Sequence, residues 1–213
     1  MINPPEWGDQ TVGPLNGESG RGLADLLVTV IRAEKGVQSV CDLGCGNGYL
    51  AGQIGAHGYR VVGVDASRPY IETANRHYAR ANVSFRCAPF DQGLTNELTT
   101  EGLFDLVVSS DVIEHLYRPS ELLSTAAPLL RSGGLLVVGT PYYGYLKNLA
   151  ISVLDRWDTH HSVHWDGGHI KLFSVRALDA MARSHGFETI RFAFYGRMPW
   201  FWKNMIIVAK KVG

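Results

Sequence analysis

The sequence has no excess of either charge and no long apolar run. Its 213 residues carry 20 Lys and Arg against 20 Asp and Glu, so the formal net charge at pH 7 is zero. Because proteins that bind polyanions usually present a basic face, this balance argues against a nucleic-acid partner. The longest apolar runs, Leu26–Ile31 and Leu135–Val138, are far shorter than the roughly 20 residues that cross a bilayer. We therefore expect no stable membrane insertion.

Cysteine is also scarce. The three cysteines, Cys41, Cys45 and Cys87, are odd in number and form no CxxC pair. The first residues, MINPPEWGDQ, lack the basic segment followed by an apolar one that marks a secretory signal. Reduced thiols in a cytoplasmic protein are the expectation.

Short apolar runs alternate with segments that have helical spacing. Strands are predicted at 39–43, 60–65, 83–87, 103–110 and 134–140. Helices are predicted at 21–34, 49–57, 70–80 and 119–130. Strands that are apolar on both faces and separated by helices indicate a parallel sheet covered on both sides, and right-handed crossovers make such a sheet doubly wound.

This alternation stops after Thr140. Residues 141–168 contain many aromatic residues and histidines and show no strand pattern. Six apolar residues there have the spacing of one helix face: Leu146, Leu149, Ala150, Val153, Leu154 and Trp157. We expect this apolar stripe to pack on the domain as a lid. A dimer contact and a contact with a membrane surface are the alternatives.

The last part of the chain predicts a helix at 174–185 and strands at 186–196 and 200–211. The short turn between these strands makes them an antiparallel hairpin. We therefore predict a single α/β domain with a doubly wound, mostly parallel seven-stranded sheet and an antiparallel C-terminal hairpin. Its parts are an N-terminal arm and helix (1–35), a core (36–140), a lid insertion (141–168), and a C-terminal helix and hairpin (169–213).

Three glycines, Gly44, Gly46 and Gly48, stand within five positions directly after the first predicted strand, in the stretch VCDLGCGNGYLAGQI. Glycine loses more conformational entropy on ordering than any other residue, so this cluster indicates a tight bend that a ligand approaches closely. In an open parallel sheet, ligands bind at the carboxyl ends of the strands, and the bend lies there.

Dinucleotides and S-adenosylmethionine both bind bends of this kind. A dinucleotide loop generally has the spacing G-x-G-x-x-G, but here the third glycine comes one position early and is followed by Tyr49. Asp42, two residues before the first glycine, would repel a pyrophosphate and would suit a cationic amine. The bend therefore favours S-adenosylmethionine, and a nicotinamide-dependent oxidoreductase is the alternative.

The stretch DLGCGNG resembles the first motif of class I S-adenosylmethionine-dependent methyltransferases. VVGVDAS, FDLVVSSDVIEHL and LLRSGGLLVVGTP resemble further motifs of this family in the same order, and together they cover roughly residues 36–141. The chain is most similar to the small bacterial branch that includes the ubiquinone-biosynthesis O-methyltransferases. That branch tends to show the pattern GGH…FS…L…GF, which residues 167–187 match.

This resemblance implies a Rossmann-like methyltransferase fold with S-adenosyl-L-methionine as cofactor. Asp42 and the backbone of the bend would hold the methionine part, Asp65 would bind the ribose, and Ala66 and Ser67 would flank the adenine. The complete set of implied cofactor residues is Asp42, Gly44, Cys45, Gly46, Asn47, Gly48, Asp65, Ala66, Ser67, Pro89, Phe90, Asp91 and Ser109.

One position departs from the family pattern. The family often has an acidic residue just after the third strand that reaches the adenine amino group. In this sequence Ala88 or Pro89 falls there, and the acid appears later. Adenine is then held either by Phe90 or by Asp91.

Methyl transfer from a sulfonium is an in-line displacement, so the protein mainly aligns donor and acceptor. An oxygen acceptor of high pKa also needs a base, for which histidine is best suited near neutrality. The candidates are His115, His169 and His164, and for each the alternative is a structural role in its loop. We predict no metal site. The four histidines in THHSVHWDGGH (159–169) are the alternative metal site, but they lack the H-x3-H spacing of a helical pair and no cysteine joins them.

We expect Tyr142, Tyr143, Trp165 and Trp200 to line an acceptor pocket, because such pockets are built from aromatic side chains and a few polar groups. The sequence thus predicts a methyltransferase that acts on a small molecule at oxygen, as a monomer or homodimer. Nitrogen or carbon acceptors are the alternatives, and a protein that binds the cofactor without catalysis is a third.

Overall fold

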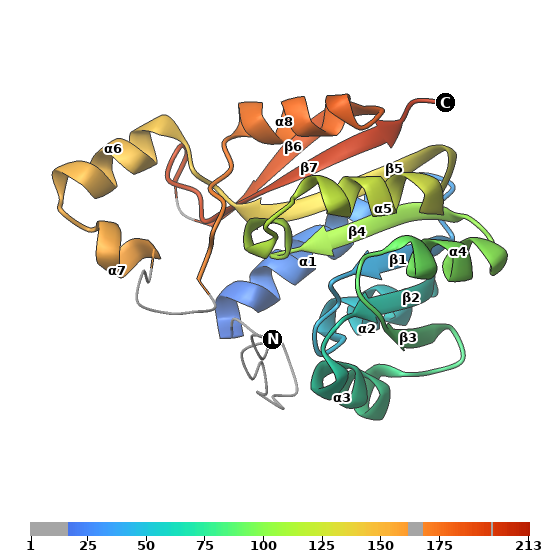
Figure 1. The fold of residues 1–213 in the computed structure, drawn as a ribbon. Helices are drawn as coiled ribbons and strands as arrows, with labels where there is room; N and C mark the ends of the chain where they lie inside the picture. The colour runs from blue at the N-terminus through green and yellow to red at the C-terminus, as the bar shows by residue number, and fades with distance from the viewer. Residues whose placement is uncertain (1–16, 162–167, 197) are drawn as a thin grey trace.

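The structure is a computed structural model that describes residues 17–161, 168–196 and 198–213 (Figure 1). One seven-stranded sheet runs through it in the order β3-β2-β1-β4-β5-β7-β6. The strands are β1 (Ser39–Leu43), β2 (Arg60–Asp65), β3 (Val83–Cys87), β4 (Phe104–Ser110), β5 (Leu130–Pro141), β6 (Phe187–Tyr195) and β7 (Asn204–Lys211).

The pairing of the strands confirms the predicted fold. The first five strands are parallel to one another, whereas β7 is antiparallel to both β5 and β6. Strand order reverses between β1 and β4, so the carboxyl ends of these two strands form the topological switch point at which ligands bind in doubly wound sheets.

The helices are α1 (Gly17–Ala33), α2 (Tyr49–Ala56), α3 (Arg68–Tyr78), α4 (Gln92–Thr100), α5 (Ser120–Leu129), α6 (Tyr145–Val153), α7 (Trp157–His161) and α8 (Val175–Ser184), with a 3-10 turn, η1 (Ile113–His115). Residues of α1, α2 and α3 share one buried cluster, and residues of α4, α5 and α8 share the other. Neighbouring strand residues such as Val61 and Val62 belong to opposite clusters, because side chains alternate along a strand. The sheet is therefore covered on both faces, as predicted.

Helix α4 is an element that the sequence analysis missed. Its sequence, QGLTNELTT, is mostly polar and buries only Leu94, Thr95 and Leu98. Its start is fixed by Asp91, whose side chain accepts a hydrogen bond from the backbone N–H of Leu94 at 2.9 Å. Two apolar residues four positions apart are too short a pattern to reveal a helix without its cap.

The expectation that the apolar stripe of residues 146–157 packs on the domain is wrong. Leu149 is 45% exposed, Val153 75% and Leu154 63%. Helix α6 instead buries Lys147 and Ile151, and it ends at Val153, so the six stripe residues do not share one helix. The Lys147 ammonium donates to the carbonyls of Tyr142 at 2.8 Å and Trp202 at 3.2 Å, which fastens α6 to the end of the sheet. Figure 1 shows α6 and α7 beyond the end of β5, away from the helices that cover the sheet.

The central strands set the stability of the fold. Leu106 lies on β4 with no exposed surface, whereas Leu103, just before the strand, is 47% exposed. Replacing Leu106 by alanine should lower the free energy of unfolding by about 2–5 kcal/mol, because it removes buried methyl groups and leaves a cavity. Leu103→Ala is the matched control and should cost far less. Urea unfolding of both variants checks the difference, and equal losses would show that β4 is not the core strand.

Candidate active site

The glycine bend follows β1 directly and has the backbone that only glycine adopts readily. Gly44, Gly46 and Gly48 have φ of +81°, +51° and +83°. The N–H groups of Gly44 and Cys45 donate to the Val64 carbonyl at 2.8 and 2.9 Å, which ties the bend to the end of β2. A side chain at Gly44 would collide with Val112, and one at Gly48 would collide with Ala74 and Phe85. The side of the bend that faces the protein is therefore packed so tightly that it has no room for side chains at these two glycines.

Asp65 ends β2 and organises the bend. Its two carboxylate oxygens accept hydrogen bonds from the N–H of Gly46 at 2.9 Å and of Ser67 at 2.8 Å. Burial raises the pKa of the Asp65 carboxyl, and these two hydrogen bonds act in the opposite direction. The predicted ribose residue thus stands beside the bend, at the carboxyl end of the neighbouring strand.

Asp42 is the unusual group of this site. It is 1% exposed, and its Oδ2 has no hydrogen-bond partner among the residues that the structure describes. Burial, followed by the nearby Asp65 carboxylate, raises the pKa of Asp42 to about 7. A hydrogen bond with the Ala51 backbone acts in the opposite direction. The unpartnered oxygen of a buried carboxylate is costly, and a cationic ligand would remove that cost.

The other predicted cofactor residues have mixed surroundings. Asn47 is buried, and its side chain accepts a hydrogen bond from the Tyr49 N–H at 3.3 Å. Cys45 is also buried, and this burial raises the pKa of its thiol. Ser109 is buried too, but its hydroxyl donates to the Leu43 carbonyl at 2.7 Å and so joins β4 to β1. Asp91 caps α4, as described above. Ser109 and Asp91 thus have structural roles that their sequence positions did not indicate.

The adenine side of the predicted site lies at the end of β3. The Ala66 carbonyl lies 3.7 Å from the Cys87 thiol, which holds the segments after β2 and β3 together. The Pro89 carbonyl accepts a hydrogen bond from the Asp91 N–H at 3.0 Å, and Phe90 packs partly buried against the core. This segment turns from β3 into α4 beside the residues that follow Asp65.

A second cluster lies at the end of β4, where η1 begins. Glu114 has no exposed surface, and its Oε2 accepts a hydrogen bond from the Thr140 hydroxyl at 2.9 Å. Its Oε1 has no hydrogen-bond partner within the described part of the chain and lies 4.0 Å from His169 Nε2. The His115 and His169 rings meet edge to face with centroids 5.0 Å apart. The fold therefore brings together two predicted catalytic histidines that are far apart in sequence.

Carboxyl groups of this cluster resist ionisation. Burial raises the pKa of Glu114 to about 8, with a further contribution from Asp111, and burial raises the pKa of Asp111 itself to about 7. Asp111 has φ of +53° and accepts a hydrogen bond from the Asn204 amide at 2.9 Å. Glu114, Asp111 and Asn204 are site residues that sequence reasoning missed, because each depends on a long-range contact.

Both histidines are held as neutral imidazoles. Burial lowers the pKa of His115, and burial together with the nearby His115 lowers the pKa of His169 to about 4. Neutral imidazoles offer the lone pair that a base or a metal ligand needs. One ligand atom from each of Glu114, His115 and His169 falls within 4.8 Å of the others, so these three side chains could hold a metal ion.

The predicted pocket residues differ from one another in environment. Tyr143 is 5% exposed, and its hydroxyl lies 3.1 Å from His169 Nδ1, so it belongs to the cluster. Tyr142 is also buried, and its ring packs edge to face against Phe194 and Trp202. Trp200 is 59% exposed on the turn between β6 and β7. His164 and Trp165 lie outside the described residues.

The comparison with protein families identifies the class. A family model described as "Methyltransferase domain" matches residues 17–191. The chain therefore belongs to this family, which confirms the predicted S-adenosylmethionine-dependent methyltransferase class and argues against the nicotinamide-dependent alternative.

Two curated relatives illustrate the similarity. Over 101 residues the chain is 39% identical to the ubiquinone biosynthesis O-methyltransferase of Caulobacter sp. (strain K31), a match covering 46% of this chain and 39% of that protein. Over 164 residues it is 29% identical to the protein of the same name from Azorhizobium caulinodans, covering 74% and 61%. The matches thus span between 39% and 61% of the length of these relatives.

Solved structures share the fold. Magnesium protoporphyrin IX methyltransferase of Synechocystis PCC 6803, solved with bound S-adenosylhomocysteine, has a TM-score of 0.67 at 20% identity, covering 96% of this chain and 90% of that one. The [4+2]-cyclase SpnF has a TM-score of 0.66 at 18% identity, covering 96% and 86%. Because a cyclase shares this fold, the reaction has to be argued from the site. Within the described residues, no helix has the length and apolarity needed to span a bilayer.

The raised pKa of Asp42 gives a test of the unliganded protein. In the unfolded chain the Asp42 carboxyl ionises at an ordinary pKa, whereas in the folded protein it ionises only near pH 7. The free energy of unfolding therefore falls as the pH rises from about 4 to about 7. Asp42→Asn removes this loss, and its free energy of unfolding relative to the parent should rise between about pH 5 and about pH 8.

Asp105→Asn is the matched control. Asp105 accepts hydrogen bonds from the N–H groups of Gln38 and Ser39, and these hydrogen bonds, with the Arg131 guanidinium, outweigh burial and hold its pKa below the ordinary value. Asp105→Asn should be less stable than the parent by the same amount at about pH 5 and at about pH 8. Both of these pH values lie above the pKa of Asp105 in the folded protein and in the unfolded chain. A difference for Asp42→Asn that does not change with pH would show that Asp42 ionises normally.

Proposed function

We propose that this protein transfers a methyl group from S-adenosylmethionine to an oxygen atom of a small acceptor with an aromatic or apolar body. The observation that carries the proposal is the adjacency of two clusters at the switch point. The bend after β1 touches Val112, the residue between Asp111 and η1, so the place for a cationic donor adjoins Glu114, His115 and His169.

The cofactor roles follow from the contacts of the bend. Asp42 and the Gly44–Gly48 backbone would hold the methionine part, since a buried carboxylate whose Oδ2 has no partner among the described residues fits a positively charged amine. Asp65 would bind the ribose hydroxyls from the end of β2. Ala66 and Ser67 would flank the adenine, with Pro89 and Phe90 on its other side.

The relatives' names support oxygen as the acceptor atom, because the matched curated proteins are named ubiquinone biosynthesis O-methyltransferases. The site supports it independently. A nitrogen acceptor with a free electron pair needs little help from a base, whereas a hydroxyl of high pKa has to lose its proton. The imidazoles of His115 and His169, neutral beside a buried carboxyl, offer that proton a lone pair.

In this reaction the new O–CH3 bond forms as the S–CH3 bond breaks, and the sulfonium becomes a neutral thioether. Alignment of donor and acceptor accounts for about 7–11 kcal/mol of the barrier. The acceptor proton moves to an imidazole nitrogen of the cluster, which contributes a factor of about 10²–10⁴. His115 and His169 are the described histidines placed to do this.

Histidine variants test the assignment. We expect His115→Ala and His169→Ala each to lower kcat by about 10²–10⁴-fold, because a base acts only in the transition state. Their affinity for S-adenosylhomocysteine, measured by calorimetry, should stay within about 2-fold of the parent. His57→Ala, an exposed position, is the control. The assay screens a panel of phenol, catechol, amine and carbon acceptors with an isotopically labelled methyl donor, and methylation of amines alone would contradict the proposal.

The placement of Glu114, His115 and His169 also favours a second way to activate the oxygen, through a divalent cation. Two imidazoles and a carboxylate within 4.8 Å of one another are a ligand set that such ions accept. A bound cation would lower the pKa of a coordinated hydroxyl and would leave no need for a histidine base.

Chelation separates the two routes. The cation route predicts that EDTA abolishes turnover, that Mg²⁺, Mn²⁺ or Zn²⁺ restores it, and that His169→Ala lowers the metal content of the purified protein. The base route predicts full turnover in EDTA. Elemental analysis of the parent and of His169→Ala, beside the EDTA assay, decides between them.

A further inference from the structure

We infer that Tyr143 is a positioning residue that fixes the His169 ring by accepting its Nδ1–H, so that the Nε2 lone pair faces Glu114 and His115. This inference rests on the proposed function and deepens it. The activation of the acceptor oxygen, by a base or by a cation, requires a lone pair on that nitrogen.

The distances around His169 carry the argument. Tyr143 Oη lies 3.1 Å from Nδ1, within hydrogen-bond range, whereas Glu114 Oε1 lies 4.0 Å from Nε2, which is too far. A proton on Nε2 would therefore point at Glu114 without reaching it. A proton on Nδ1 is satisfied by the Tyr143 oxygen. The unpartnered Oε1 and the Nε2 lone pair then face the same gap, where an acceptor hydroxyl or a cation can meet both.

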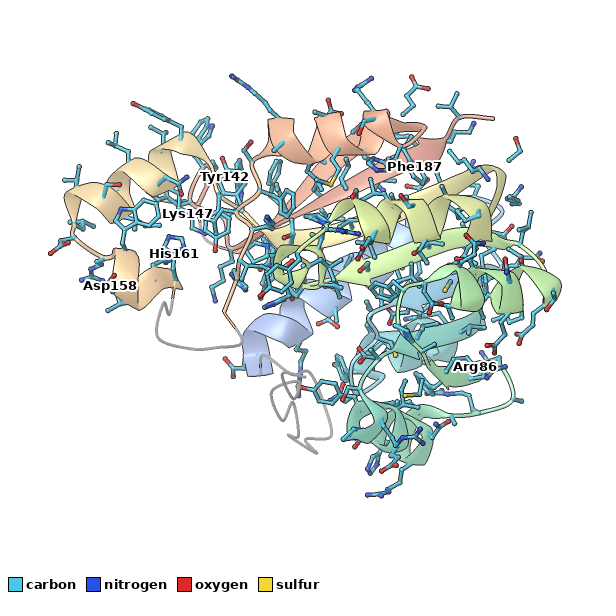
Figure 2. All side chains as sticks on the ribbon, viewed as in Figure 1. Arg86, Tyr142, Lys147, Asp158, His161 and Phe187 are labelled. Carbon is cyan, nitrogen blue, oxygen red and sulfur yellow. The ribbon has the colours of Figure 1, made fainter. Side chains whose placement is uncertain are left out.

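Tyr143 is itself held from several sides. Its ring stacks on His161 with centroids 5.4 Å apart, and its N–H donates to the Phe173 carbonyl at 3.2 Å. The Lys147 ammonium lies 5.2 Å from the ring centroid. Figure 2 shows Lys147 and His161 on the two helices that lie beyond the end of β5. Because these contacts fix the ring, the hydroxyl is placed before any ligand binds, which is the requirement for a residue that orients another.

The backbone around His169 is also fixed relative to Glu114. The N–H groups of Ile170 and Lys171 both donate to the Glu114 carbonyl at 3.0 Å. The segment that carries His169 is therefore fastened to the backbone of η1. The tautomer and the orientation of the imidazole are then set by its side-chain contacts, and Tyr143 makes a hydrogen bond to that ring at 3.1 Å.

Nitrogen-15 NMR of the imidazoles tests the tautomer without any acceptor. In the full-length protein, with the signal assigned by its loss in His169→Gln, we expect His169 to carry its proton on Nδ1. In Tyr143→Phe this pattern should give way to the Nε2–H form that predominates for an unconstrained histidine. A parent protein with the proton on Nε2 would overturn the inference.

Kinetics test the consequence. Tyr143→Phe keeps the ring and its stack on His161 but removes the oxygen, so kcat should fall by about 3- to 10-fold, the contribution of one hydrogen bond. The KM for S-adenosylmethionine should be unchanged, and the melting temperature should fall by only about 2–4 °C, the cost of one lost hydrogen bond. Tyr59→Phe, at the opposite end of the sheet, is the control and should leave all three values unchanged. If Tyr143→Phe loses the Nδ1–H form of His169 but keeps the kcat of the parent, Tyr143 has no part in the mechanism. If no acceptor is methylated, the proposed function fails while the NMR result still decides the tautomer.

Discussion

The site depends on a carboxylate that folding buries with one of its oxygens unpartnered. Asp42 sits at the end of β1 with almost no exposed surface, and the structure gives its Oδ2 no hydrogen bond from the described residues. Such a group destabilises the unliganded protein, because a charge in a low-dielectric interior loses its hydration. Asp42 carries this cost directly before a bend whose glycines allow a ligand to approach. A cation bound there converts the cost into binding energy.

The sheet brings a second set of polar groups to the same edge. Because strand order reverses between β1 and β4, the residues after these strands are neighbours, and the bend touches the segment that leads into η1. That segment then gathers partners from distant parts of the chain: Thr140 from β5, Asn204 from β7 and His169 from the stretch before α8. Donor and acceptor chemistry thus adjoin without sharing residues.

Much of this organisation was predictable from the sequence, since strands β1 to β5 are short apolar runs and the bend is a dense glycine cluster. The parts that were missed depend on contacts that no local pattern contains. Helix α4 is set by one cap at Asp91. The stripe of residues 146–157 looked like a buried face, yet hydrogen bonds from Lys147 to two carbonyls fix the orientation of α6. The role of Glu114 could not be predicted, because it depends on contacts with Thr140 and His169, which lie far along the chain.

The most direct test of the account is a crystal structure grown with S-adenosylhomocysteine. In that structure we expect the ligand's amino group against Asp42, its ribose at Asp65 and its sulfur toward the side where Glu114 and His115 lie. Ligand density in that orientation would support every later step. Density elsewhere on the molecule, or a bend from Gly44 to Gly48 that stays empty at saturating ligand, would contradict it.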